Sequence, residues 1–112
     1  MRKVKDTVPF EDVSKIRFRG VYIPNLYLYD KNLNITRKML LSMLLYIEKY
    51  YGHRVITGAY LANILGLSKT TVGKELRNLE ELNYIKSKVK EHKNIVLGKR
   101  YYVLIKPESR DE

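Results

Sequence analysis

The sequence predicts a single α+β domain in which a core of three helices is joined to a small antiparallel sheet. Apolar residues recur at intervals of three and four over 35–51 and again over 57–82, as on the buried face of a helix. They alternate with polar residues over 85–90 and 100–106, as in a strand with one buried face. A chain of 112 residues is long enough for one core and too short for two.

Composition sets the outer bounds of this domain. The first fourteen residues are polar and charged and predict a flexible basic arm, so the folded domain is expected over 15–107 and a disordered tail over 108–112. There is no cysteine, so neither a disulfide framework nor a thiolate metal site is available. The longest apolar run, 39–47, is far short of a membrane span, and no secretory signal precedes it. A cytoplasmic protein without membrane contact is therefore expected.

The segment 15–23 alternates apolar and polar residues and predicts a half-buried strand that ends at Pro24. Residues 26–33 are expected to form a connector with turn chemistry at Asp30 and Asn32.

The first long helix is expected to begin after Asn34 as its N-cap and to end at Gly52. Its apolar residues occupy more than one side, so more than one side must be buried. Either the N-terminal strand or another subunit covers the second side, and a homodimer is favoured because two-fold dimers dominate among small assemblies.

Two further helices are predicted over 57–82, with a tight turn between them. Thr57 and Ser68 are N-cap residues for the two helices, and Gly66 can adopt the left-handed conformation that ends the first. Leu67 is expected to insert into the core. Helices joined by so short a turn must cross steeply, which is the helix-turn-helix geometry.

The sheet is predicted from three short strands. The first lies over 53–56, the second over 85–90, and the third over 100–106 until Pro107 stops it. Residues 91–99 are expected to form an exposed loop between the last two strands. The apolar Ile95 and Leu97 are unusual in such a loop, and they would either extend the strands or meet a partner.

The spacing of Ala62, Gly66 and Val72 resembles the helix-turn-helix of winged-helix DNA-binding proteins, and the segment LEELNYI over 79–85 extends the resemblance from the second helix into a strand. Asn83 stands where such families often have glycine, and asparagine also tolerates the left-handed conformation. The resemblance implies a winged helix-turn-helix fold in which the hairpin is the wing.

The start of the domain resembles a second group of proteins. The residues IPN at 23–25, followed by LNITRKMLLSMLLYI at 33–47, resemble the opening of the N-terminal winged-helix domains of plasmid and phage replication proteins and of small transcriptional regulators. The similarity covers 21–105.

The charge pattern indicates a nucleic-acid partner. The 22 basic and 12 acidic residues give a formal net charge of +10, which favours a polyanion. The second helix of the helix-turn-helix, called the second motif helix, is expected to enter the major groove of DNA with its exposed side. Its residues Thr70, Thr71 and Lys74 are expected to contact bases. The candidate DNA-binding residues of this helix are Ser68, Lys69, Thr70, Thr71, Lys74, Arg77 and Asn78.

The hairpin adds a second set of cations. Lysines that alternate along a strand share one face, which suits contact with the DNA backbone or minor groove beside the helix. The candidate residues here are Lys86, Lys88, Lys93, Lys99 and Arg100.

The sequence therefore predicts a sequence-specific binder of double-stranded DNA, in the role of a dimeric transcriptional regulator. Two alternatives stay open: a replication-initiation or partition factor of a mobile element that also contacts a replication or partition protein, and a winged helix used for protein or RNA contact. An enzyme is not expected, because His53 and His92 fall in unrelated loops and no catalytic or metal-ligating set accompanies them. No cofactor is expected.

Overall fold

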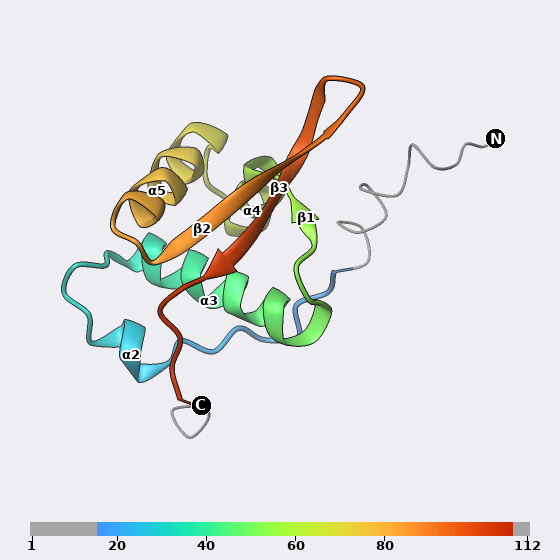
Figure 1. The fold of residues 1–112 in the computed structure, drawn as a ribbon. Helices are drawn as coiled ribbons and strands as arrows, with labels where there is room; N and C mark the ends of the chain where they lie inside the picture. Colours follow the sequence, from blue (N-terminus) through green and yellow to red (C-terminus); the bar gives the residue numbers. More distant parts are fainter. Residues whose placement is uncertain (1–15, 109–112) are drawn as a thin grey trace.

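The computed structural model describes residues 16–108 (Figure 1), so the predicted arm and residues 109–112 of the predicted tail lie outside the described part of the chain. The predicted α+β class is confirmed: the described residues form helices and an antiparallel sheet of three strands, the last two of which make a C-terminal hairpin. The elements are α2 (Asn25–Leu28), α3 (Ile35–Tyr51), β1 (Val55–Ile56), α4 (Gly58–Leu65), α5 (Lys69–Glu81), β2 (Ile85–His92) and β3 (Ile95–Val103).

Helix α3 has the boundaries that the sequence predicts. The Asn34 side chain accepts a hydrogen bond from the Arg37 backbone N–H at 2.8 Å, which satisfies a first-turn donor. Gly52 ends the helix at φ 77°, a conformation that costs glycine little. Six residues of α3 are buried, namely Leu40, Leu41, Ser42, Met43, Leu44 and Ile47.

The prediction of an N-terminal strand is wrong. Residues 16–23 are extended, but they form no strand and instead lie along α3. The backbone N–H groups of Arg17 and Arg19 each donate to a tyrosine hydroxyl of α3, at 3.0 Å, and the Phe18 ring packs 5.2 Å from the Tyr46 ring. The alternating pattern therefore reflects half-burial against a helix, with tyrosine hydroxyls replacing a neighbouring strand.

The predicted connector contains the short helix α2. Its Tyr27 is fully buried, and the phenol donates to the Ile105 carbonyl at 2.6 Å. Burial, with Glu48 nearby, raises the pKa of Tyr27 above its ordinary value, so this phenol stays protonated and holds the C-terminal segment.

Both caps of the motif helices are confirmed. The Thr57 hydroxyl accepts from the Tyr60 N–H at 3.0 Å, Gly66 is left-handed at φ 71°, and the Ser68 hydroxyl accepts from the Thr71 N–H at 3.0 Å. The expectation for Leu67 is wrong, because its side chain is 39% exposed. Leu67 closes the turn through its main chain, whose N–H donates to the Ala62 carbonyl at 3.0 Å.

The sheet has the order β1-β3-β2, and all neighbouring strands are antiparallel. The hairpin is longer than predicted, since both strands continue through 91–99 and leave only Lys93 and Asn94 in the turn. These two residues have φ of 53° and 67°, the positive pair of a type I′ turn, whose twist matches the flanking strands. Figure 1 shows the end of this hairpin projecting beyond the helices.

Strand β3 ends at Val103, three residues before the predicted end. The Leu104 N–H still donates to the Tyr84 carbonyl at 2.8 Å, but Ile105 already accepts from Tyr27 of α2. The chain thus leaves the sheet to cover α2. Just before β2 begins, Asn83 is left-handed at φ 66°, as expected for the position where winged-helix patterns often have glycine.

Gly98 of β3 lies against the backbone of the neighbouring strand β1. A Cβ atom at this position would be 2.7 Å from the Ile56 carbonyl oxygen and 2.9 Å from Cγ1 of Val55. We expect Gly98→Ala to lower the free energy of unfolding by about 1–3 kcal/mol, because the backbone of β1 must move. Urea unfolding followed by far-UV circular dichroism measures this change.

The matched control is Gly73→Ala in α5, where a Cβ atom would meet nothing within 4 Å. This variant should gain about 0.5–1 kcal/mol, since alanine is the better helix former. If Gly98→Ala were as stable as the unchanged chain, the close approach of β1 to Gly98 would be wrong.

Candidate nucleic-acid interface

A groove of about 550 Å³ runs between α5 and β3. Helix α5 lines one side of it with Lys69, Gly73, Leu76, Arg77 and Glu80. Strand β3 lines the other side with Val96, Leu97, Lys99 and Tyr101, and Gly58 and Ala59 at the start of α4 also line it. The structure therefore joins part of the predicted helix site to part of the predicted hairpin site.

The groove carries three cations, Lys69, Arg77 and Lys99, against one carboxylate, that of Glu80. The Ser87 hydroxyl donates to both oxygens of Glu80, at 3.1 and 3.2 Å. Burial, with Glu80 nearby, raises the pKa of Tyr101 to about 12, so its phenol adds no negative charge at neutral pH. The net positive charge of the side chains that line the groove favours an anionic ligand.

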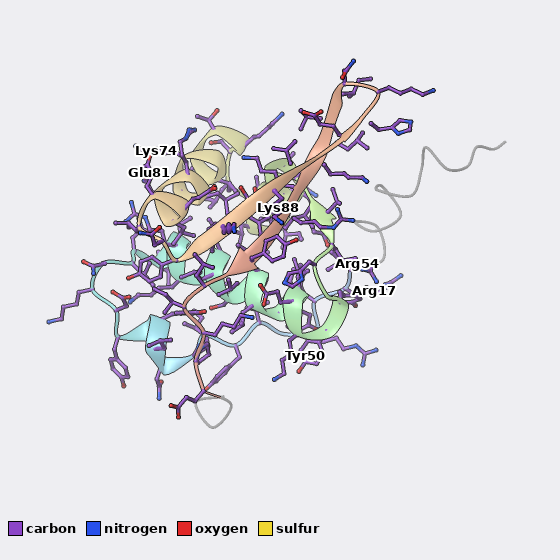
Figure 2. All side chains as sticks on the ribbon, in the orientation of Figure 1. Arg17, Tyr50, Arg54, Lys74, Glu81 and Lys88 are labelled. Carbon is purple, nitrogen blue, oxygen red and sulfur yellow. The ribbon has the colours of Figure 1, made fainter. Side chains whose placement is uncertain are left out.

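The charge of α5 changes sign along its length. Lys69 and Lys74 lie in the first half, whereas Glu75, Glu80 and Glu81 lie in the second half with Arg77. The unpaired N–H groups at a helix N-terminus add partial positive charge at the basic end. Figure 2 shows Lys74 and Glu81 on the side of α5 away from the sheet. An anion should therefore approach the first half of α5.

The polar side chains of α5 and its N-cap differ in whether they already hydrogen-bond within the protein. The Ser68 hydroxyl accepts from the Thr71 N–H and donates to the Thr71 hydroxyl oxygen at 2.8 Å, so it is used by the helix cap. The Asn78 side chain hydrogen-bonds Glu75. Thr70 and Lys74 are exposed on the helix surface. Of the three residues expected to contact bases, Thr71 is thus partly engaged within the cap.

An ion pair fixes α5 to α3. Nε of Arg37 lies 2.7 Å from Oε1 of Glu75, and the Asn34 amide donates to Oε2 at 3.2 Å. Burial acts to raise the pKa of Glu75, but the hydrogen bonds from Arg37 and Asn34 outweigh it and the pKa lies below its ordinary value. Sequence reasoning missed this pair because its members are 38 residues apart and no local pattern links them.

The hairpin cations do not share one face, and this corrects the expectation that they all lie beside the motif helix. Cross-strand partners point to the same side of a sheet. Lys88 pairs with Arg100 and Lys86 with Tyr102, whereas Lys99 pairs with Val89 on the side that faces the groove. Lys86, Lys88 and Arg100 therefore face away from α5, and Lys88 is labelled in Figure 2.

Lys93 lies at the end of the hairpin, in the turn. The Arg100 guanidinium is held by the chain itself, because its Nε donates to the His53 carbonyl at 2.9 Å. Only Lys99 of the five predicted hairpin residues lines the groove.

Comparison of the chain with known protein families, with characterised proteins and with solved structures finds no match. Within residues 16–108, no three side chains of His, Asp or Glu gather as a metal site would require. In the same range, no helix has the length and apolarity needed to cross a bilayer.

The Arg37–Glu75 pair generates a pH prediction. A carboxyl whose pKa is lower in the folded chain stabilises the fold above its ordinary pKa, and this stabilisation is lost as the pH falls through the folded value. Glu75→Gln should lower the free energy of unfolding at neutral pH by about 1–2 kcal/mol, because it removes a hydrogen-bonded charge. The difference from the unchanged chain should shrink as the pH is lowered to about 3.

Urea unfolding at both pH values measures the effect. The control is Glu81→Gln, which changes an exposed carboxylate on the same helix. Equal losses for Glu75→Gln at the two pH values would contradict the role of the charge.

Proposed function

We propose that this chain is a winged helix-turn-helix protein that binds double-stranded DNA sequence-specifically, with α5 as the recognition helix and the β2–β3 hairpin as the wing. The observation that carries the proposal is the groove between α5 and β3, where cations from both elements converge beside the exposed first half of α5. The three-residue connection between α4 and α5 and the strand order support the same fold.

The exposed half of α5 suits the major groove, whose width admits one helix. Thr70 and Lys74 are exposed near the start of the helix, where recognition helices contact base edges. Gly73 has open space where a side chain would be, so the helix backbone can approach the DNA closely. Lys69, Arg77 and Lys99 flank this half and would contact phosphates.

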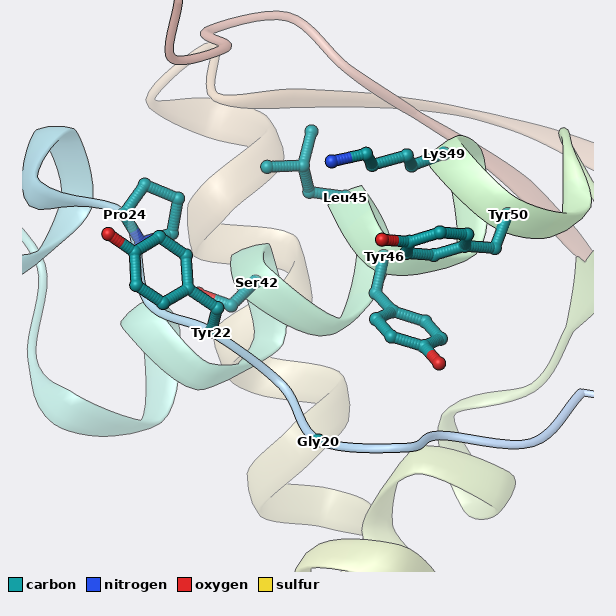
Figure 3. Close-up of a pocket in the computed structure, with 8 residues that line it drawn as sticks. All are labelled: Gly20, Tyr22, Pro24, Ser42, Leu45, Tyr46, Lys49 and Tyr50. Atoms are coloured by element: carbon teal, nitrogen blue, oxygen red, sulfur yellow. The ribbon is translucent and has the colours of Figure 1, made fainter. Parts of the chain in front are cut away.

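A dimer on a repeated or palindromic site, acting in transcriptional regulation, is part of the proposal. The outward surface of α3 supports it, because Tyr22, Leu45, Tyr46 and Tyr50 surround a hollow of about 170 Å³ (Figure 3). Tyr22 and Tyr50 are 54% and 61% exposed, and exposed aromatic side chains are enriched at protein contacts. Sedimentation equilibrium measures the mass of the assembly. The alternative of a replication or partition factor shares the DNA interface and differs in its binding sites.

Recognition of a specific duplex should depend on the exposed cations of α5. Lys74→Ala combined with Arg77→Ala should abolish the preference for a specific duplex without lowering thermal stability, since both side chains are exposed. Fluorescence anisotropy with the duplex upstream of the gene, competed by random duplex, measures the preference. The matched control, Arg17→Ala with Lys31→Ala, also removes two exposed charges but lies outside α5, the hairpin and the hollow on α3.

An unchanged preference in the α5 variant would contradict the assignment of the recognition helix. If the chain bound RNA or a protein partner but no duplex, the alternative of a winged helix used for protein or RNA contact would be supported instead.

Two lysines on opposite faces of the hairpin, Lys88 and Lys99, distinguish the groove from the other side of the sheet. Lys99→Ala should reduce the slope of log affinity against log salt by about one unit for every duplex, because a phosphate contact and its counterion are lost. Lys88→Ala removes the same charge from the face turned away from α5 and should change the slope much less. Anisotropy titrations at several salt concentrations give both slopes. Equal slopes for the two variants would contradict the placement of duplex in the groove.

A further inference from the structure

The face of the sheet turned away from the helices has a charge that the proposed duplex site does not use. We call this the outer sheet face, and it is formed by Lys86, Lys88, Lys90, Arg100 and Tyr102, with the His53 ring beside it. Over 85–90 and 98–103, every charged side chain of the two strands is positive. Such a surface is complementary to a polyanion.

Two aromatic rings lie within these cations. The ring centroids of Tyr102 and His53 are 4.2 Å apart, with an angle of 35° between the ring planes. Nζ of Lys88 lies 5.8 Å from the Tyr102 centroid, and the Arg100 guanidinium holds the His53 carbonyl at 2.9 Å. Tyr102 is half-buried, whereas the His53 side chain is 42% exposed. The rings are thus ordered before any ligand binds, while part of their surface stays accessible.

One carboxylate lies close to this surface without cancelling its charge. Glu48 of α3 approaches Nε2 of His53 at 3.4 Å, but its side chain is only 9% exposed. Its oxygens accept from the Val103 N–H at 2.6 Å and from Nζ of Lys106 at 2.7 Å. Glu48 therefore hydrogen-bonds the backbone at the end of β3, and the positive charge of Lys106 neutralises its carboxylate.

We propose that the outer sheet face binds single-stranded nucleic acid, with a base stacked against the Tyr102–His53 pair and phosphates held by Lys86, Lys88 and Arg100. Aromatic rings surrounded by cations are the usual composition of single-strand sites, because every unpaired base has a free π-face. In a duplex those faces are covered by neighbouring bases, so the rings would gain nothing from a double strand. The combination of rings and charge thus favours a single strand over a duplex backbone or an acidic protein.

The position of this surface makes it independent of the duplex groove. Lys88 and Lys99 lie on opposite faces of the same hairpin, as their cross-strand partners Arg100 and Val89 require. A single strand on the outer sheet face and a duplex at α5 would therefore not compete for the same side chains. Variants on the two faces can separate the two activities.

The test is fluorescence anisotropy with labelled oligothymidine and oligouridine of about 15 nucleotides and with a random duplex of equal length. Tyr102→Ala should weaken binding of the single strands on the order of tenfold, whereas Tyr102→Phe keeps the ring and should bind as the unchanged chain does. Lys88→Ala should weaken the single strands more than Lys99→Ala does, the reverse of their effects on duplex. The two oligonucleotides distinguish a DNA strand from an RNA strand.

Thermal unfolding by circular dichroism confirms that each variant is folded, and Tyr102→Leu replaces the alanine variant if that one does not fold. The proposal is overturned if the unchanged chain binds no single strand, or if the alanine or leucine variant binds as well as Tyr102→Phe. It is also overturned if loss of the ring weakens duplex as much as single strand, since the outer sheet face would then contact a duplex backbone.

Discussion

The need to bury α3 on several sides determines how the rest of the chain is arranged. Its apolar residues point in more than one direction, and an α-helix of this kind is stable in water only when other elements cover it. The N-terminal segment lies along one side and the sheet and α5 cover others. The Arg37–Glu75 pair then fixes the position of α5 on this base, so the placement of the candidate interface follows from the packing of α3.

The two-residue period of a strand divides the charge of the hairpin between two functions. Neighbouring residues point to opposite faces, so Lys99 lines the groove while Arg100 belongs to the outer sheet face. A hairpin that carries cations on both faces presents one surface beside α5 and another away from it. The proposed duplex and single-strand sites differ in chemistry as well as position, because only the outer sheet face joins its cations to a pair of aromatic rings.

Charge also gives α5 a direction. Its first half is basic and begins with a capped N-terminus, and its second half contains three glutamates, one of which is paired with Arg37. The acidic half would be repelled by phosphates, whereas the basic half and the groove attract them. In the proposed complex, the end of the helix that meets DNA is thus set by electrostatics as well as by shape.

The sequence by itself determined the local features of this protein: the caps at Asn34, Thr57 and Ser68, the left-handed residues Gly66 and Asn83, and the α+β class. These depend on hydrogen bonds and backbone conformations within a few residues, which a short pattern can specify. Only the tertiary structure decided that residues 16–23 cover α3 instead of pairing in the sheet, that Glu75 meets Arg37, and that the hairpin cations divide between two faces. Those outcomes depend on contacts between distant parts of the chain and on strand register. The periodicity of the sequence leaves them open, because it specifies which residues share a face but not what that face packs against.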